Sequence, residues 1–540
     1  MLSSAGWTFA DIWERYAAAL PDYPAQWHGG AITTWAQFNR RANGLAATML
    51  AQGVEQGDRV VQYLYNGPEY LETLFACFKI GLVPVNTNYR YGDDEVAYIW
   101  DNADAVAVVF HGTFADRCAR IRSRVPTVKH WIWVDDGSGT CPEWAIALEG
   151  AAQCDSGANT AATWGRSGED MLFLYTGGTT GMPKGTMWRQ EDLIGSFESS
   201  NRVKIDAFPT TTVLDARASK PGPRNLPAAP LMHGTGLFGA FSNLNLAGSI
   251  VTTTSRSFDV VEFLDTVQTV GVNGTSIVGD AFAKPILKAL DADPGRWDIT
   301  SLRVIVSSGV MWSADTKAGL LRHNDRLIMV DTLGSSEAIG MASNTTTAGA
   351  EMKTATFTLG PNTKVLTEDG REVAWGSDER GRVALRGYTP VGYWKDETKS
   401  AETFPVYNGV RYSIPGDWAT VDADGVVNLL GRGSQCINTG GEKVYPEEVE
   451  EALKLHASVA DAAVVGLPDE RFGQAITALV ELHADSVFDS DALVGHVKQR
   501  LASYKAPKKV FVIDTIGRAP NGKLDYKELT RRAIELDAVT

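Results

Sequence analysis

The stretch Thr176–Gly185, TGGTTGMPKG, combines glycines, hydroxyl groups and one lysine within a short loop. Glycines can adopt positive φ and bring backbone N–H groups close to a bound anion. The threonines add hydroxyl donors, and Lys184 adds a positive charge. The spacing is not that of a Walker loop, because Lys184 is followed by Gly185. The segment predicts a phosphate-binding loop, against the alternative of a flexible surface turn. The candidate ligands are Thr176, Gly177, Gly178, Thr179, Thr180, Gly181 and Lys184.

The apolar run Met171–Tyr175 precedes this loop and predicts the strand that delivers it. Earlier in the chain, strand and helix patterns alternate, which indicates parallel α/β layers. The pattern returns around Met171 and over 301–309, so we expect two α/β sheet subdomains. The expected elements of the first subdomain are strands over 58–65, 82–88 and 105–112, with helices over 67–81 and 93–103.

The last third of the sequence predicts a different architecture. From about residue 364 to 430, short strands and turns indicate a small β-barrel-like subdomain. Between Pro446 and Ile516, helix and strand patterns indicate a compact α+β tail. We therefore predict the α/β class, with a large N-terminal domain over 1–432 and a smaller C-terminal domain over 433–540.

The composition limits the function classes. The 540 residues are 44% hydrophobic and 21% charged, which is ordinary for a globular protein of several packed units. A net charge of −15 argues against a broad nucleic-acid or anionic-membrane face, though not against an anion in one loop. The five cysteines are scattered without a CxxC pair, which indicates reduced thiols and a cytoplasmic location.

Two segments test the idea of a secreted or membrane protein. Asp11 and Glu14 fall where a signal peptide would carry its apolar stretch, so the N-terminal segment predicts an amphipathic surface helix. The stretch Asn225–Ser255 lacks Asp, Glu, Lys and Arg, but Pro227, Pro230 and its glycines disfavour a membrane-spanning helix. We interpret it as a buried, ligand-lining segment.

The loop Thr176–Gly185 resembles the phosphate-binding signature of the adenylate-forming superfamily, which includes acyl- and aryl-CoA synthetases, carrier-protein adenylation domains and beetle luciferases. The usual signature is Ser-Gly-Thr-Thr-Gly-x-Pro-Lys-Gly, so Gly177 replaces its serine. Further motifs resemble the family in order, over nearly the whole chain. They look closest to a bacterial subgroup of fatty-acyl-CoA ligases, some of which act on steroid side-chain acids.

The segment PLMHGTG, residues 230–236, resembles the family's Pro-Leu-x-His motif. The resemblance implies that His233 borders the acyl pocket, against the alternative of a packed core histidine. The adjoining GTGLFG also spells the GxGxxG pattern of a dinucleotide-binding loop. A dinucleotide-binding loop requires a strand directly before it, and Pro230 interrupts that segment. We therefore favour the interpretation that His233 borders the acyl pocket.

The segment LGSSE, Leu333–Glu337, resembles the family's Tyr-Gly-x-Thr-Glu motif. The resemblance implies that Glu337, with Thr180, holds magnesium beside the ATP phosphates. Leu333 replaces the tyrosine that usually stacks on adenine. Upstream, SSGVMW resembles the turn that borders adenine and the acyl group. The nucleotide-binding candidates in these two motifs are Ser308, Gly309, Leu333, Gly334, Ser335 and Ser336.

The remaining motifs lie nearer the C-terminus. Asp417 matches the aspartate of the family's Thr-Gly-Asp, which binds ribose, with Pro415 in place of the threonine. In the junction motif that begins at Gly431, Arg432 resembles the second ribose ligand and Ser434 the hinge.

Gly441 would border the passage of the coenzyme A pantetheine arm, and Lys523, in RAPNGKL, matches the catalytic lysine. The resemblance implies a mobile C-terminal domain that carries both residues. The chain is therefore expected to be an ATP-dependent acid–thiol ligase, an acyl-CoA synthetase using ATP, magnesium and coenzyme A. Its catalytic candidates are Lys523, Glu337, Lys184 and His233.

The substrate follows less directly. By family position, Gly279, Gly309 and Gly334 would line the acyl pocket and leave room for a medium-to-long-chain or bulky hydrophobic acid, with a short or aromatic acid left open. We expect neither a nucleic-acid partner nor a membrane span, and a homodimer stays open.

Three other functions compete. An adenylating enzyme could load a carrier protein instead of coenzyme A. The GTGLFG pattern would suit a nucleotide-dependent oxidoreductase. A catalytically inactive binding protein is disfavoured because Lys184, Glu337, Asp417 and Lys523 are all present.

Overall fold

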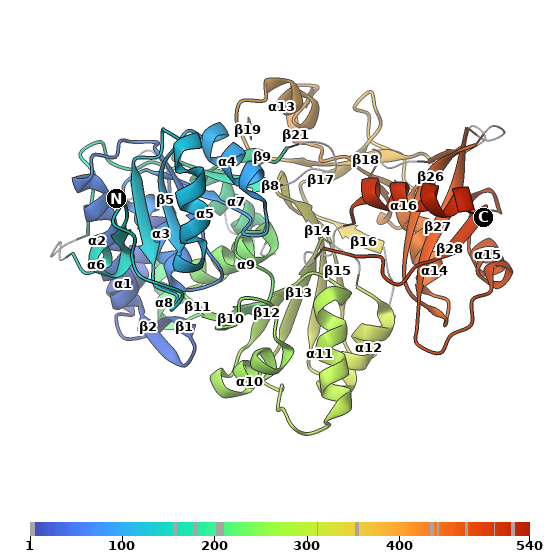
Figure 1. Ribbon diagram of the computed structural model, residues 1–540, viewed down its shortest axis with the longest axis horizontal. Coiled ribbons are helices and arrows are strands. Elements are labelled where there is room, and N and C mark those ends of the chain that lie inside the picture. Colours follow the sequence, from blue (N-terminus) through green and yellow to red (C-terminus); the bar gives the residue numbers. More distant parts are fainter. Residues whose placement is uncertain are drawn as a thin grey trace. The chain divides into compact units, whose positions relative to one another are not determined.

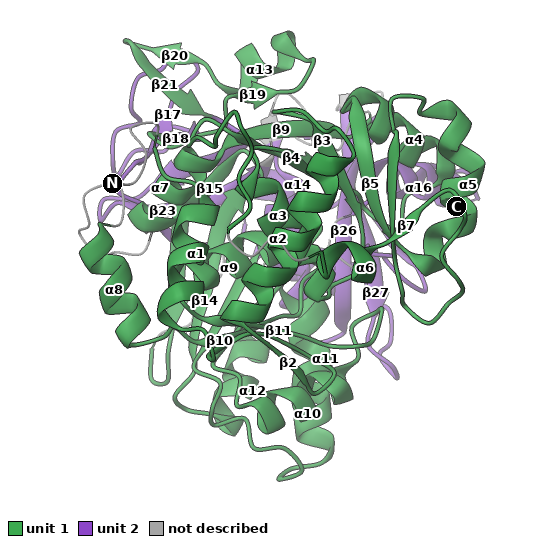
Figure 2. Cartoon of the chain, turned by 90° about the vertical axis from the view of Figure 1, so that its left-hand side faces the viewer, with its two compact units in different colours: residues 1–354, 386–413 green, residues 355–385, 414–540 purple. Residues whose placement is uncertain are grey.

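The protein is described here by a computed structural model (Figure 1). The described residues are 6–154, 159–176, 182–200, 210–309, 312–350, 356–432, 437–439, 442–469, 473–501, 503–519 and 524–539. The chain forms two compact units, residues 1–354 with 386–413 and residues 355–385 with 414–540 (Figure 2). The domain boundary at residue 432 stays a prediction, because a division into compact units does not show which segment moves.

The first sheet of unit 1 has the strand order β19-β9-β8-β4-β3-β5-β6-β7. The strands from β8 to β7 are parallel, whereas β9 runs antiparallel to β8, and β19 to β9. The predicted alternation of strand and helix is confirmed here. The bounds are β3 Arg59–Tyr63, α3 Pro68–Lys79, β4 Val83–Asn86, α4 Asp93–Asn102, β5 Ala105–His111, η1 Gly112–Phe114, α5 Ala115–Ile121, η2 Arg122–Arg124, β6 His130–Val134, β7 Ile146–Ala147, α6 Leu148–Ala152, β8 Met171–Thr176, β9 Lys184–Arg189 and β19 Gly392–Tyr393.

The second sheet of unit 1 has the order β2-β1-β11-β10-β12-β13-β14-β15, parallel from β1 to β14. The first and last strands of this order, β2 and β15, run antiparallel to their neighbours β1 and β14. Its strands are β1 Pro24–His28, β2 Ala31–Thr34, β10 Arg224–Pro227, β11 Ser249–Thr252, β12 Gly274–Ile277, β13 Val304–Ser308, β14 Ile328–Ser335 and β15 Ala338–Thr346. The other elements of unit 1 are α1 Phe9–Ala19, α2 Trp35–Ala51, α7 Gln190–Ser200, α8 Thr211–Ser219, α9 Gly234–Asn245, α10 Val260–Val270, α11 Asp280–Ala292, α12 Ala314–His323, α13 Glu397–Thr403, β20 Val406–Tyr407 and β21 Val410–Ser413.

Unit 2 contains the α+β tail and part of the predicted β-rich segment 364–430, of which 386–413 belong to unit 1. In the tail, β26 and β27 form a long antiparallel pair, and β28 joins β27 in parallel. The α/β class and the larger and smaller parts of the prediction are confirmed. The elements of unit 2 are β16 Thr356–Leu359, β17 Thr363–Leu366, β18 Gly381–Arg386, β22 Asp417–Val421, β23 Val426–Arg432, β24 Ile437–Thr439, β25 Glu442–Val444, α14 Pro446–Lys454, β26 Val459–Asp469, β27 Gly473–Leu482, α15 Ser490–Lys498, η4 Ser503–Lys505, β28 Lys509–Val512 and α16 Tyr526–Val539.

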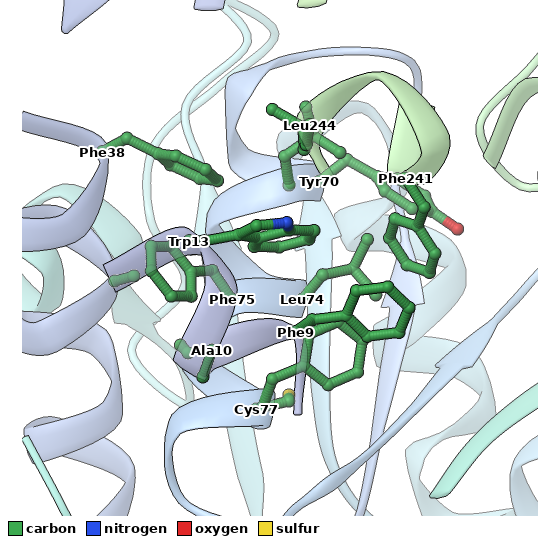
Figure 3. Close-up of a cluster of buried hydrophobic side chains, with 14 of the residues drawn as sticks. Phe9, Ala10, Trp13, Phe38, Tyr70, Leu74, Phe75, Cys77, Phe241 and Leu244 are labelled. Atoms are coloured by element: carbon green, nitrogen blue, oxygen red, sulfur yellow. The ribbon is translucent and has the colours of Figure 1, made fainter. Parts of the chain in front are cut away.

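Helix α1 lies deeper in the protein than the sequence predicts. A capping box between Thr8 and Asp11 starts it. Its large apolar side chains are fully buried, and Trp13 lies in a cluster of aromatic rings (Figure 3). The Trp13 ring centre is 5.3 Å from that of Phe75 and 5.8 Å from that of Phe241. The expectation of an amphipathic helix is confirmed, because one face of α1 forms part of the core. Its charged face is covered as well, since the side chains of Asp11 and Glu14 are 12% and 11% exposed and pair with Arg166.

We expect Trp13→Ala to lower the free energy of unfolding by about 3–5 kcal/mol, because it leaves a large cavity and removes the hydrogen bond from Trp13 Nε1 to Asn245 Oδ1 at 3.0 Å. Trp375→Ala is the matched control, since Trp375 is 58% exposed. Chemical denaturation would check this, and equal losses in the two variants would contradict the placement of α1.

The charge-free stretch Asn225–Ser255 forms β10, α9 and β11, and most of it is buried. The interpretation as a buried segment is confirmed. In α9, a Cβ at Gly236 would lie 2.4 Å from the Pro230 carbonyl oxygen, so this glycine is required by close packing. Among the residues that the structure describes, no helix combines the length and apolar content that crossing a membrane requires.

Glu72 of α3 is a buried carboxylate with an incomplete set of partners. Arg41 Nε donates to its Oε1 at 2.7 Å, but the same guanidinium also binds the exposed Glu149. No described residue offers a hydrogen bond to the buried Glu72 Oε2. Burial outweighs the Arg41 charge and raises the pKa of Glu72 to about 7.

A raised carboxyl pKa stabilises the fold below the unfolded-state value and loses that contribution as pH rises through the folded-state value. From pH 4.5 to 7, wild type should therefore lose up to about 3 kcal/mol relative to Glu72→Gln. Thermal unfolding between pH 5 and 8 measures the difference. Glu528→Gln is the control, because the hydrogen bond from Arg531 holds the pKa of Glu528 below its usual range. A pH-independent difference for Glu72→Gln would contradict the burial argument.

Candidate active site

The predicted phosphate loop connects two neighbouring strands. β8 ends at Thr176 and β9 begins at Lys184, and these residues are register partners. At Gly185, a Cβ would lie 2.7 Å from the Tyr175 ring, so the close strand pairing requires glycine there. The two ends of the loop are therefore held side by side, as an anion cradle requires.

Lys184 contacts two side chains from the segment 392–396. Its ammonium forms an ion pair with Asp396 and lies 5.9 Å from the centre of the Tyr393 ring. Tyr393 is held by β19, which pairs with β9, and Asp396 caps α13 by accepting from Lys399 N–H at 2.9 Å. Hydrogen bonds from Lys184 and from the Lys399 N–H hold the pKa of Asp396 below its usual range.

Glu337 lies in the turn that joins β14 to β15. Tyr393 Oη donates to its Oε1 at 2.9 Å. Its backbone is fixed as well, because Glu337 N donates to Ser335 Oγ at 3.2 Å and Ser413 Oγ donates to Glu337 O at 2.6 Å. The turn is thus held from two strands, and its carboxylate is oriented by one tyrosine.

Trp188 of β9 connects this turn to the phosphate-loop hairpin. The ring is buried, and Nε1–H donates to the Ser336 carbonyl oxygen at 2.8 Å. Through Trp188 and Tyr393, the structure brings Lys184 and Glu337 together, as the two motifs predict. Their roles as phosphate and magnesium ligands stay predictions.

The carboxyl ends of β12, β13 and β14 bring the other nucleotide candidates of unit 1 to one edge. Ser308 lies beside Thr332 in the parallel register. At Gly309, a Cβ would touch only Val278 among the described residues, at 3.7 Å, so the positive φ of +91° favours glycine there and close packing does not. At Gly334 the lack of a side chain is explained by close packing, since a Cβ there would lie 3.0 Å from the Ala338 carbonyl oxygen.

Leu333, the residue in place of the adenine-stacking tyrosine, lies on β14 at this same edge. Its side chain is 9% exposed. Most of the residue is therefore covered.

His233 precedes α9, and buried Asn86 at the end of β4 fixes its neighbour. Asn86 Nδ2 donates to the Met232 carbonyl oxygen at 2.7 Å and to the Tyr175 carbonyl oxygen at 2.9 Å. Asn86 Oδ1 accepts from Tyr175 N at 2.6 Å. One side chain therefore links the strand that enters the phosphate loop to the histidine segment.

In unit 2, the two predicted ribose ligands lie on adjacent strands. Asp417 begins β22, Arg432 ends β23, and the two residues are register partners. Asp417 is buried, and Gly416 before it has φ +111°. The side chain of Arg432 lies outside the described part of the structure, as do Gly177, Gly178, Thr179, Thr180, Gly181, Ser434, Gly441 and Lys523.

Comparison with known proteins supports the motif order. The sequence model of the AMP-binding enzyme family matches residues 13–394, and that of the AMP-binding enzyme C-terminal domain matches residues 448–523. This chain belongs to the AMP-binding enzyme family. The predicted family resemblance is confirmed.

Two curated relatives of this AMP-binding enzyme are each 38% identical to it. One is a 3-oxocholest-4-en-26-oate–CoA ligase of Rhodococcus rhodochrous, with 96% of this chain and 94% of the relative covered. The other is a medium/long-chain-fatty-acid–CoA/3-oxocholest-4-en-26-oate–CoA ligase of Mycolicibacterium smegmatis, with 96% and 95% covered.

Among solved structures, the anthranilate CoA ligase AuaEII in complex with anthranoyl-AMP superposes with a TM-score of 0.83. It is 22% identical and covers 100% of this chain and 99% of its own. At that identity the likeness establishes the fold alone. The prediction of an ATP-dependent acid–thiol ligase rests on the sequence relatives and is confirmed by them.

The residues present in this AMP-binding enzyme fit magnesium that arrives with a nucleotide. The described part of the chain holds no group of three or more His, Cys, Asp or Glu side chains that could cage a metal. It does present Glu337, oriented by Tyr393. Magnesium is typically held by one or two carboxylates together with substrate phosphates and water, so this donor set suits it.

Three residues of this site lie outside the predicted motifs: Asn86, Tyr393 and Asp396. For Asn86 a signal was present, because a polar amide ends the apolar strand segment LVPVN. For Tyr393 and Asp396 nothing in GYWKDE separates a site residue from a surface turn. Their contacts with Glu337 and Lys184 join residues 56 and 212 positions apart in the chain.

Proposed function

We propose that this AMP-binding enzyme is an acyl-CoA synthetase for medium-to-long-chain or bulky hydrophobic carboxylic acids, including steroid side-chain acids. The observation that carries the proposal is the meeting of Lys184 and Glu337 beside one tyrosine, in a chain 38% identical to CoA ligases over nearly its full length. The relatives' names support the substrate class and the use of coenzyme A.

The first half-reaction joins two anions. A carboxylate oxygen of the acid attacks the α-phosphorus of ATP, an acyl–AMP anhydride forms, and pyrophosphate leaves. Positioned positive charge is the main requirement of such a step. Lys184 and the loop N–H groups would neutralise the phosphates, and magnesium held by Glu337 with Thr180 would supply further charge stabilisation. Lys523 would bridge the carboxylate and the α-phosphoryl group.

The second half-reaction moves the acyl group. The thiol sulfur of coenzyme A attacks the acyl carbon, AMP leaves with the bridging oxygen, and the thiol proton goes to solvent. Lys523 must withdraw and Gly441 must approach, so we propose that the segment 433–540 rotates about Ser434. Asp417 and Arg432 would hold the ribose, with Ser308, Gly309 and Leu333–Ser336 around the adenine. His233 would border the acyl group.

The glycine at 309, where a Cβ would touch only Val278 among the described residues, and the apolar segment around His233 support a wide acyl group. The glycine pattern that suggested an oxidoreductase has a packing explanation in Gly236. A cytoplasmic location and a homodimer stay predictions.

The test is to incubate the protein with ATP, magnesium and a panel of fatty, steroid and aromatic acids, and to measure pyrophosphate with and without coenzyme A. Pyrophosphate together with a fatty or steroid thioester is the expected result. Acyl-AMP without thioester would indicate that a carrier protein is the acceptor. A preference for aromatic or short acids would contradict the substrate class, and no pyrophosphate with any acid would contradict the activity.

A further inference from the structure

The segment 392–396 touches both charged groups of the nucleotide site. We propose that Tyr393 and Asp396 are positioning residues: Tyr393 fixes the Glu337 carboxylate for magnesium, and Asp396 holds Lys184 until the nucleotide phosphates replace it. The inference rests on the proposed function, because it assigns partners to two of its predicted ligands. It adds to that function a nucleotide-free state in which Lys184 and Glu337 are already held in position.

The ion pair between Lys184 and Asp396 is weak enough for the nucleotide phosphates to replace Asp396. The side chains are 36% and 29% exposed, and an ion pair so accessible to water changes an equilibrium constant by at most about fivefold. A triphosphate carries several negative charges into the same loop and can therefore displace one carboxylate. Until then Asp396 keeps the ammonium near the mouth of the β8–β9 hairpin and neutralises it.

The pair is not needed to anchor the segment. Asp396 already caps α13 through Oδ1, whereas Lys184 binds Oδ2. The neighbouring Lys395 forms its own ion pair with Asp104, at 2.8 Å. Backbone pairing of Tyr393 with Thr186 holds the segment to β9 independently of either ion pair.

Tyr393 is suited to orient a metal ligand. Its ring centre lies 5.7 Å from that of Phe404, and its backbone is fixed in β19, so the hydroxyl has a defined position. By donating to Oε1 of Glu337 it sets the direction of the other carboxylate oxygen. Partners of this kind typically change metal affinity by about 10–100-fold.

The first experiment measures ATP binding by calorimetry with metal ions chelated. Asp396→Asn keeps the helix cap, since asparagine caps well, but removes the charge that competes with phosphate. We expect its Kd for ATP to fall about two- to fivefold. Asp104→Asn makes the same change of charge at the neighbouring ion pair and should leave the Kd unchanged. Weaker binding by Asp396→Asn, or equal behaviour of the two variants, would overturn the role of Asp396.

The second experiment titrates manganese, as a spectroscopic substitute for magnesium, into the ATP complex and follows the free ion by electron paramagnetic resonance. Tyr393→Phe should raise the half-saturating manganese concentration about tenfold while its metal-free Kd for ATP stays that of wild type. Tyr16→Phe, which loses a buried hydroxyl bonded to the Asn245 carbonyl oxygen, is the control. An unchanged manganese titration for Tyr393→Phe would overturn the role of Tyr393.

Failure of the proposed function and failure of this inference give different experimental results. If wild type neither binds ATP nor forms acyl-AMP, the proposed function fails and this inference fails with it. If wild type forms acyl-AMP but Asp396→Asn and Tyr393→Phe match their controls, only the inference is overturned.

Discussion

Replacing Lys523 with alanine is expected to slow acyl-adenylate formation by on the order of 10²-fold or more, while thioester formation from supplied acyl-adenylate continues. The first step brings a carboxylate onto a phosphate, and a lysine that bridges them stabilises charge that redistributes only in the transition state. In the second step the attacked atom is the acyl carbon, and the lysine is not required. Single-turnover assays of each half-reaction measure the split.

Gly441→Leu is the reciprocal variant. A side chain in the expected passage of the pantetheine arm should block thioester formation and leave acyl-adenylate formation near the wild-type rate. Together the variants test the predicted rotation of residues 433–540. If each variant loses both half-reactions to the same extent, a two-state C-terminal domain is wrong.

Glu337→Gln is expected to slow pyrophosphate release by on the order of 10²-fold at a fixed, moderate magnesium concentration. The amide oxygen still accepts from Tyr393 Oη, so the turn keeps its geometry while the negative charge that attracts the metal is lost. Raising magnesium should recover part of the rate, because the phosphates themselves still bind the ion.

The control for this variant is Glu402→Gln on α13, where the carboxylate is exposed and pairs with Lys399. It should leave the magnesium dependence of the rate unchanged. A Glu337→Gln enzyme whose magnesium dependence equals that of Glu402→Gln would contradict the metal role of Glu337.

Local periodicity explains why the fold was largely predictable. The strands and helices between residues 58 and 112 follow from short-range alternation, and the structure confirms them. The depth of α1 was not predictable in this way. Asp11 and Glu14 suggest a solvent-facing side, but both carboxylates bind Arg166, more than 150 residues away. A partner so distant in sequence leaves no local signal.

In the candidate site too, the chemical groups were predictable from local sequence and their partners were not. The lysine and glutamate at 184 and 337 lie in motifs whose residue types suit phosphate and metal binding, and the structure brings them together. What holds them was not readable from the motifs: Tyr393, Asp396 and Asn86 act across strands that become neighbours only in the folded sheets. Sequence therefore predicted the chemical groups, and the tertiary structure identifies their positioning partners.

The origin of one oxygen atom in the AMP product shows whether the acid is activated as an acyl-adenylate. The acid is supplied with its carboxylate labelled with heavy oxygen, ATP and coenzyme A are unlabelled, and the AMP product is examined by mass spectrometry. If the carboxylate attacks the α-phosphorus and the thiol then cleaves the acyl carbon–oxygen bond, one labelled oxygen must appear in AMP. Unlabelled AMP, or ADP in its place, would contradict activation through an acyl-adenylate.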